Sequence, residues 1–93
     1  RAMDDVESAH YLRLRVLDRS GVMKAISTIL ANHDISIEAL VQKEVAPDSA
    51  DAEVVILTHE VRGGPLGAAL DELAACDFVH GQLMHLRVEH LSV

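Results

Sequence analysis

Residues 11–22 read YLRLRVLDRSGV, and this stretch decides the fold. Leu12, Leu14 and Val16 alternate with Arg13 and Arg15, which is the period of a half-buried strand. Turn-forming residues follow at once. Beyond them, apolar residues recur at helical spacing up to about residue 33. The stretch therefore predicts a strand that passes directly into a helix.

The rest of the chain predicts the topology. We expect a strand over residues 35–44, a β-branched strand over 53–59, a helix over 65–75 that begins at Pro65, and a last strand over 79–88. The order is βαββαβ, and each helix has one apolar stripe. This pattern predicts an α+β, ferredoxin-like fold: a four-stranded antiparallel sheet with two helices on one face and the first and third strands in the centre.

Length and composition limit the class of protein. The 93 residues make one domain, which we place at 10–93, with 1–9 as a linker or frayed N-terminal arm. A net charge of -7 and an aromatic content of 2% argue against a nucleic-acid partner. The sequence has no transmembrane run and no signal peptide, so no membrane partner is expected. The single cysteine, Cys76, favours a reducing compartment, and we predict a cytoplasmic location.

The sequence does not indicate catalytic machinery. His80 and His85 are spaced to lie on opposite faces of a strand, which is unsuited to a shared metal ion. Arg19 lacks the glycine-rich cradle of an acylphosphatase-like site, and residues 63–67 lack the spacing of a phosphate loop. We expect no catalytic residue, no metal site and no cofactor site in this chain, and a packing role for Cys76.

The corner after the first strand, residues 18–21, offers one binding chemistry. The N-terminus of a helix presents free amides that can receive a carboxylate, and Asp18 can accept hydrogen bonds from an ammonium group. Such a corner suits a small zwitterion. An ordinary helix cap explains the same residues, so both interpretations stay open at this point.

The strand order and the corner DRSGV, residues 18–22, resemble the ACT domain, a module that senses amino acids. Residues 11–16 (YLRLRV), 35–44 (ISIEALVQKE) and 56–60 (ILTHE) are similar to the C-terminal ACT domain of bacterial homoserine dehydrogenases. The resemblance covers residue 10 to about residue 89, which is nearly the whole expected fold.

The resemblance implies a regulatory role. A parent enzyme of that family interconverts homoserine and aspartate semialdehyde with NAD(P), and its catalytic domains, with the dinucleotide fingerprint and the catalytic lysine, lie upstream of the ACT domain. The implied effector is a small amino acid, threonine first, held where two subunits meet. The matching effector-binding residues are Asp18, Arg19, Ser20, Gly21, Val22, Ile35, Ser36 and Ile37.

Two alternatives stay open. The ACT domain of guanosine tetraphosphate synthetase-hydrolases also shows an Asp-Arg-Ser-Gly corner, although its later strands differ. A structural or interaction module that binds no small molecule is compatible with the same periodicity.

The second strand is expected to leave one edge of the sheet open. Unpaired backbone groups on that edge, with Leu40 on its outer face, predict a homodimer through this strand and the first helix. The two copies would form a continuous eight-stranded sheet.

The alternation in the last strand predicts a cationic strip on the sheet face away from the helices. There, His85 and Arg87 would lie beside Arg13 and Arg15. The strip would be either a solvated face or a surface that docks to an acidic part of the parent enzyme.

Overall fold

The computed structural model of the chain describes residues 7–88, which form five strands and two helices. In chain order the elements are β1 (Glu7–Leu17), α1 (Val22–Asn32), β2 (Ile37–Glu44), β3 (Asp51–Thr58), β4 (Val61–Arg62), α2 (Gly63–Ala74) and β5 (Val79–Val88). Neither helix in this part of the chain is long and apolar enough to cross a membrane.

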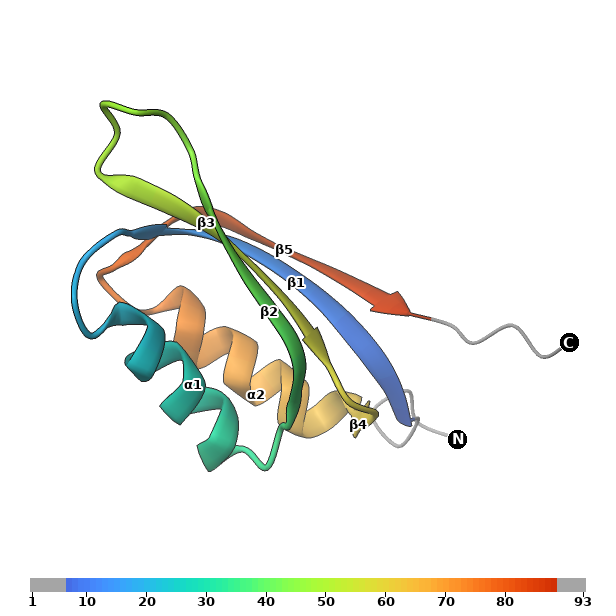
Figure 1. Ribbon diagram of the computed structural model, residues 1–93. Coiled ribbons are helices and arrows are strands. Elements are labelled where there is room, and N and C mark those ends of the chain that lie inside the picture. Colours follow the sequence, from blue (N-terminus) through green and yellow to red (C-terminus); the bar gives the residue numbers. More distant parts are fainter. Residues whose placement is uncertain (1–6, 89–93) are drawn as a thin grey trace, which may run out of the picture.

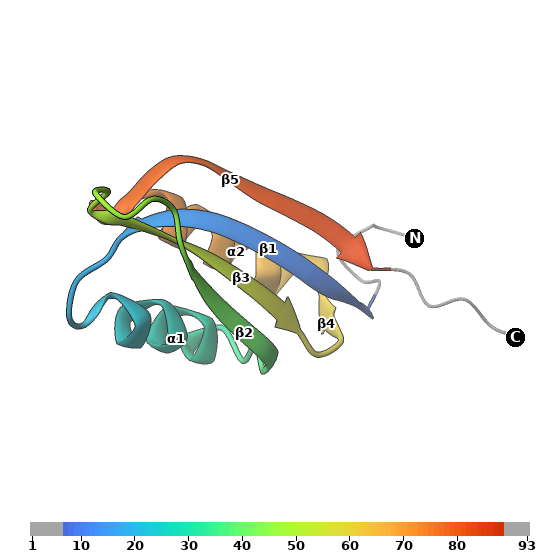
Figure 2. The same cartoon turned by 45° about the horizontal axis from the view of Figure 1, so that its top comes forward.

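The strands form one antiparallel sheet, and both helices cover the same face of it (Figure 1). β2 pairs with β3, β3 with β1, and β1 with β5, so β1 and β3 are central and β2 lies at an edge. Figure 2 shows the other face of the sheet without a helix. The predicted α+β, ferredoxin-like fold is confirmed. The short strand β4, which pairs with the start of β1, is an addition that the sequence pattern did not predict.

The core lies between the sheet and the two helices, and it follows from the alternation in the central strands. In the register of β1 and β3, Leu12 lies opposite Ile56 and Leu14 opposite Val54, and all four are buried. Apolar side chains on one stripe of each helix pack against this face. The largest fully buried side chains are Leu12, Leu14, Ile26, Leu30, Ile56, Leu66, Leu73, Val16, Val54 and Thr58.

β1 begins earlier than the sequence predicted. Glu7 and Ser8 pair with Arg62 and Val61 of β4, and Ser8 is buried. A two-residue partner strand leaves no periodic signal in the sequence, which is why this extension was missed. The prediction of an arm up to residue 9 is therefore wrong for residues 7–9, and the remainder of that arm lies outside the described residues.

α2 begins at Gly63, two residues before the predicted start at Pro65. Arg62 precedes it in an extended conformation, with φ -74° and ψ 149°. Gly63 and Gly64, which precede the predicted start, are therefore part of the helix. Pro65 fits there because the amides of the first helical turn have no partner within the helix.

β5 presents the opposite faces from those predicted. Arg13 lies opposite Met84, whereas the buried Leu12 lies opposite His85. Met84 and Leu86 therefore lie on the helix-free face, and His85 lies on the helix side, away from Arg13. The predicted cationic strip is wrong. Alternation could not identify the faces, because both sets of side chains in this edge strand are exposed near its end.

β2 contains a β-bulge that changes which side chains face the helices. Ile37 lies opposite Thr58, but Ala39 lies opposite Leu57, so two steps along β2 match one step along β3. Beyond the bulge, the odd-numbered residues of β2 face away from the helices. Leu40 lies opposite the buried Ile56, on the helix side, so the prediction that Leu40 is on the outer face is wrong.

His10 is a buried titratable residue on the helix side of β1. It is 4% exposed, its Nδ1 lies 2.8 Å from Nε2 of His85, and its backbone N–H donates to Oγ1 of Thr58 at 3.0 Å. Burial lowers the pKa of His10 from the usual 6.5, and the nearby positive charges of His85 and Arg87 lower it further. The backbone of Val61 acts in the opposite direction.

This environment predicts a loss of stability in mild acid. The unfolded chain takes up a proton on His10 near pH 6.5, whereas the folded chain takes it up only at lower pH. The unfolded state therefore binds more protons in this window, and the free energy of unfolding falls as the pH drops below 6.5. Urea unfolding of the 93-residue chain between about pH 5 and pH 8 measures the slope.

His10→Gln should flatten this slope. His59→Gln is the matched control, because His59 is exposed and lies between β3 and β4. A slope that stays the same in His10→Gln would show that other groups cause the acid sensitivity.

Candidate functional site: two hollows at the ends of helix α1

The corner between β1 and α1 presents backbone groups at the start of the helix. Gly21 is the residue that precedes α1, with φ 91° and ψ -16°, and no side chain caps the helix. The corner is held by the backbone of Asp18, whose N–H donates to the carbonyl of Ala50 at 2.7 Å. The start of α1 is therefore capped by Gly21 without a side-chain hydrogen bond.

A small hollow of about 220 Å³ opens at this corner. It contains four of the five predicted corner residues but not Asp18, whose Oδ1 accepts a hydrogen bond from Nε2 of Gln42 at 3.3 Å. Ala25 and Phe78 also line it, although the sequence pattern did not predict either. Phe78 lies here because the N–H of Leu17 donates to its carbonyl at 2.8 Å, a contact between distant residues that no local pattern reveals. The lining residues are Arg19, Ser20, Gly21, Val22, Ala25 and Phe78.

A larger hollow of about 450 Å³ lies at the other end of α1, beside the start of β2. It contains all three residues that were predicted at the start of the second strand. Asp34, which the sequence pattern did not predict as a site residue, has a φ of 59° where the chain leaves α1. Aspartate is one of the few residues that adopt this left-handed conformation readily. The lining residues are Ser27, Ala31, Asp34, Ile35, Ser36 and Ile37.

Helical spacing could have found the missed residues of the larger hollow. Ser27 and Ala31 are exposed and lie four residues apart, so they share the face of α1 that leads to Asp34. Small exposed residues on one helix face leave room beside the neighbouring strand.

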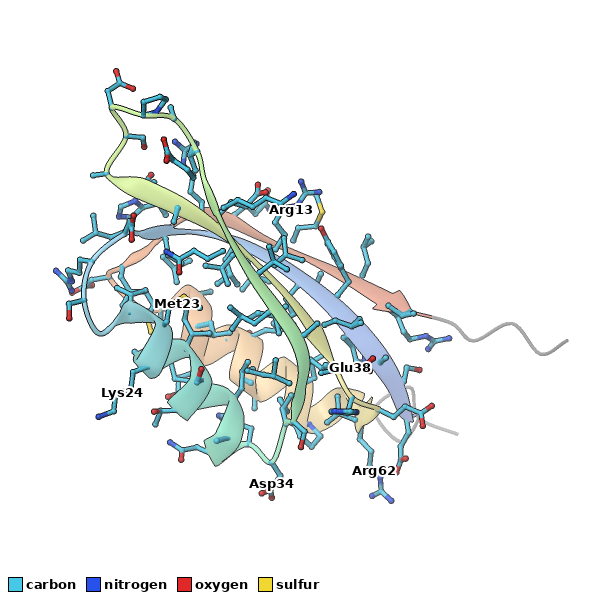
Figure 3. The ribbon with its side chains drawn as sticks, viewed as in Figure 1. Arg13, Met23, Lys24, Asp34, Glu38 and Arg62 are labelled. Carbon is cyan, nitrogen blue, oxygen red and sulfur yellow. The ribbon has the colours of Figure 1, made fainter. Side chains whose placement is uncertain are left out.

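The two hollows cannot enclose one small molecule within a single chain. α1 has 11 residues, and at 1.5 Å per residue it separates them by about 16 Å. Figure 3 shows this separation, with Met23 and Lys24 near the start of α1 and Asp34 beyond its end. Residues 19–22 and 35–37 therefore line two separate hollows within one chain, which we term the first and the second half-site.

The chemistry of the two half-sites differs. The first has the N-terminus of α1 and Arg19, both of which favour an anionic group such as a carboxylate. The second has the Asp34 carboxylate and the hydroxyl groups of Ser27 and Ser36, which can accept hydrogen bonds from an ammonium group. Together they complement the two ends of a zwitterion.

The histidines of β5 do not converge. Nδ1 of His80 lies 2.9 Å from Oδ1 of Asp51 on the helix-free side, whereas His85 contacts His10 on the helix side. The prediction that His80 and His85 lie on opposite faces is confirmed. Within residues 7–88 no three His, Cys, Asp or Glu side chains are grouped as a metal site requires.

Cys76 packs at the end of α2. Its side chain lies against the core, and Sγ donates to the carbonyl of Glu72 at 3.4 Å. Burial raises the pKa of the Cys76 thiol, and the carboxylates of Glu72 and Asp77 raise it further. The protonated thiol is a poor nucleophile, which supports the predicted packing role.

The described residues do not fit the pyrophosphate of a nicotinamide dinucleotide. Such a site needs several glycines in a loop between a strand and a helix. The corner after β1 has only Gly21, and the glycines among residues 63–67 lie inside α2. No cofactor chemistry is therefore assigned to this chain.

Comparison with known proteins agrees with this geometry. Residues 10–78 match the family model of the ACT domain. The chain is 36% identical over 88 residues to homoserine dehydrogenase from Methylobacillus glycogenes and 38% identical over 89 residues to that from Neisseria gonorrhoeae. These alignments cover 95% and 96% of this chain but only 21% and 20% of the relatives. The chain thus spans about a fifth of their length.

Solved structures give the same result. A homoserine dehydrogenase from Thiobacillus denitrificans is 39% identical, with a TM-score of 0.84, over 96% of this chain and 19% of that one. The ACT domain of GTP pyrophosphokinase from Chlorobium tepidum has a TM-score of 0.68 over 87% of this chain and all of that one, but at 17% identity this likeness concerns the fold alone. The predicted resemblance to the ACT domain of homoserine dehydrogenases is confirmed, and the chain belongs to the ACT domain family.

Proposed function

We propose that this chain is a regulatory domain that binds a small amino acid, threonine first, between two copies of itself. The observation that carries the proposal is the pair of half-sites at opposite ends of α1, one suited to a carboxylate and the other to an ammonium group. The effector residues are those named from the sequence in residues 18–22 and 35–37, with Asp34 and Ser27 added.

The open edge of β2 supplies a way to join the half-sites. Within the described residues β2 pairs only with β3, and seven of its eight residues are exposed, Leu40 and Val41 among them. A two-fold axis beside β2 would pair the two edges antiparallel and make an eight-stranded sheet. It would also set the α1 helices of the two copies antiparallel, which brings the first half-site of one copy to the second half-site of the other.

In this arrangement each ligand group has a partner. The amides at the start of α1 receive the carboxylate, and the carboxylate of Asp34 accepts hydrogen bonds from the ammonium group. Ser36 can bond the hydroxyl group of threonine. Asp18, which the sequence analysis assigned to the ammonium group, faces Gln42 within one chain and would take that role only if a second chain displaced this contact.

The proposal extends to the parent protein. We infer that it is a cytoplasmic homoserine dehydrogenase, an NAD(P)-dependent oxidoreductase, whose catalytic domains bind the cofactor and are partners of this domain. Similarity over about a fifth of such enzymes supports this inference. Regulation then requires that threonine bind one arrangement of the parent better than another.

Calorimetric titration of the 93-residue chain with threonine tests the binding. Serine, isoleucine and methionine are titrated beside it to measure selectivity. Asp34→Asn should weaken binding at least tenfold, because a hydrogen bond to a charged group contributes about 1.5–3 kcal/mol. Asp48→Asn is the matched control, since Asp48 is exposed in the loop between β2 and β3.

No heat from any of the four amino acids, with the fold confirmed by circular dichroism, would leave a module that binds no small molecule. Binding that Asp34→Asn and Asp48→Asn weaken equally would place the site elsewhere.

A further inference from the structure

The helix-free face of the sheet carries two apolar rows that cross all four long strands. In one row Tyr11 lies opposite Leu57 on one side and Leu86 on the other. In the next row Arg13 takes the same place. The apolar residues of the two rows are Ala39, Leu57, Tyr11 and Leu86, then Val41, Val55 and Met84.

These rows are open to solvent. Val41 is 47% exposed, Met84 44% and Leu86 56%, and Figure 2 shows both helices on the other side of the sheet. Three large exposed apolar residues among seven on one face are more than the scattered single residues of an ordinary surface. On the side toward the loop between β2 and β3, the next row consists of Lys43, Glu53, Arg15 and His80, so the apolar rows end there in a polar border. Apolar residues bordered by polar ones are typical of a protein interface.

Arg13 lies in the middle of this face with donors to spare. One of its terminal nitrogens is 3.9 Å from Oε2 of Glu53, and the other lies 3.4 Å from Sδ of Met84. Its Nε is buried and has no hydrogen-bond partner among the described residues. Arg15, by contrast, donates from Nε to Asp51 at 2.9 Å. Figure 3 shows Arg13 on the side of the sheet away from α1.

We propose that this face binds the same face of a second copy of the chain, so that two sheets pack against each other. Charge complementarity favours a second copy as the occupant of this face. Arg13 on β1 lies opposite Val55 on β3, and Glu53 is its diagonal neighbour, 3.9 Å away. A two-fold axis that runs along the strands between β1 and β3 lays the apolar rows of one copy over those of the other and sets Arg13 beside Glu53 of the second copy. Both loosely paired groups then gain a partner, and the apolar rows around them are removed from water.

The size of the face sets the strength of the contact. Four strands at about 4.8 Å spacing and six residues at about 3.3 Å give roughly 19 by 20 Å, or about 400 Å² in projection on each copy. The total of about 800 Å² is below that of a standard stable interface, so the contact is weak on its own. It is distinct from edge pairing through β2, and the two together would stack two eight-stranded sheets.

Charge reversal tests the contact through its symmetry. Arg13→Glu and Glu53→Arg each place like charges over one another, and each should weaken association at least tenfold. An equimolar mixture of the two variants should restore it, because position 13 of one then meets the opposite charge at position 53 of the other. Sedimentation velocity from roughly 10 µM to 1 mM, where weak interfaces become populated, measures the masses.

Arg62→Glu is the matched control. Arg62 also carries a loose ion pair, 3.7 Å from Glu7, but it lies on β4 beyond this face (Figure 3), so association should not change. Leu86→Gln, which removes apolar area without adding charge, should also weaken association.

The expected result is that each single charge variant halves the largest mass and that the mixture recovers it. Wild-type chains that stay monomeric, or single variants that assemble as the wild type does, would overturn the proposal. Variants that stay apart when mixed would do so as well. Threonine titration of Arg13→Glu tests the effector site separately, because residues 18–22 and 35–37 lie off this face.

Discussion

Leu30→Ala should lower the free energy of unfolding by about 2–5 kcal/mol, the largest effect that we expect of a single substitution in this domain. Leu30 is fully buried in α1 and packs in the main core cluster. Truncation removes its transfer free energy and leaves a cavity that a well-packed core closes only in part. Since a domain of this size has about 5–15 kcal/mol of stability in total, urea denaturation should show a large shift of the midpoint.

Leu86→Ala is the matched control for this loss. The same atoms are removed from a residue that is 56% exposed on β5, and at low protein concentration the change should stay within about 1 kcal/mol. Equal losses from the two substitutions would contradict the placement of β5, because they would put Leu86 in the core as its sequence pattern first indicated.

The central strands could be predicted from the sequence because each has one face in the core and one in water. Leu12, Leu14 and Val16 are buried in β1 while Arg15 is exposed, so the period of two reports burial directly. The β-branched strand predicted over residues 53–59 is β3, whose Val54 and Ile56 are buried while Val55 lies on the outer face. The order of the strands followed from the same pattern together with the position of the two helices.

The edge strands could not be predicted in the same way, because alternation there does not report burial. In β5, Met84 and His85 are both exposed. The alternation of apolar and polar residues therefore predicts two faces but does not indicate which of them packs against the core. In β2 a bulge near Glu38 changes the phase, and bulges of this kind leave no apolar signature. The local sequence was ambiguous at the strands with only one neighbour.

The candidate site was predictable where it depends on a local motif. The resemblance to the ACT domain named residues 18–22 and 35–37, and all but Asp18 line one of the two hollows. Phe78 was missed because it reaches the corner through a contact between distant residues, and Asp34 because the end of a helix leaves little periodic signal. The separation of the two half-sites by α1 could not be predicted from the sequence. Because of this distance, a small molecule that contacts both half-sites requires two chains.

The second large effect is expected at Gly21, where Gly21→Val should lower the free energy of unfolding by about 1–3 kcal/mol. Its φ of 91° lies in the region that residues with a side chain rarely adopt, and a β-branched side chain tolerates it least. No atom lies within 4 Å of the position that a Cβ would occupy at Gly21, so the loss comes from the backbone conformation and not from a clash within the chain. Urea unfolding of the variant measures it.

Gly21→Asn separates a loss caused by the backbone conformation from one caused by a steric clash. Asparagine also adds a Cβ and further side-chain atoms, but it adopts left-handed conformations more readily than valine, so it should cost less than Gly21→Val if conformation is what matters. Equal losses would mean that neighbouring atoms close over this position. Threonine titration of Gly21→Asn then tests whether the ligand or a second copy lies against this position. The space beside Gly21 is open within one copy. A folded variant that no longer binds threonine would therefore mean that the ligand or the second copy approaches the backbone there.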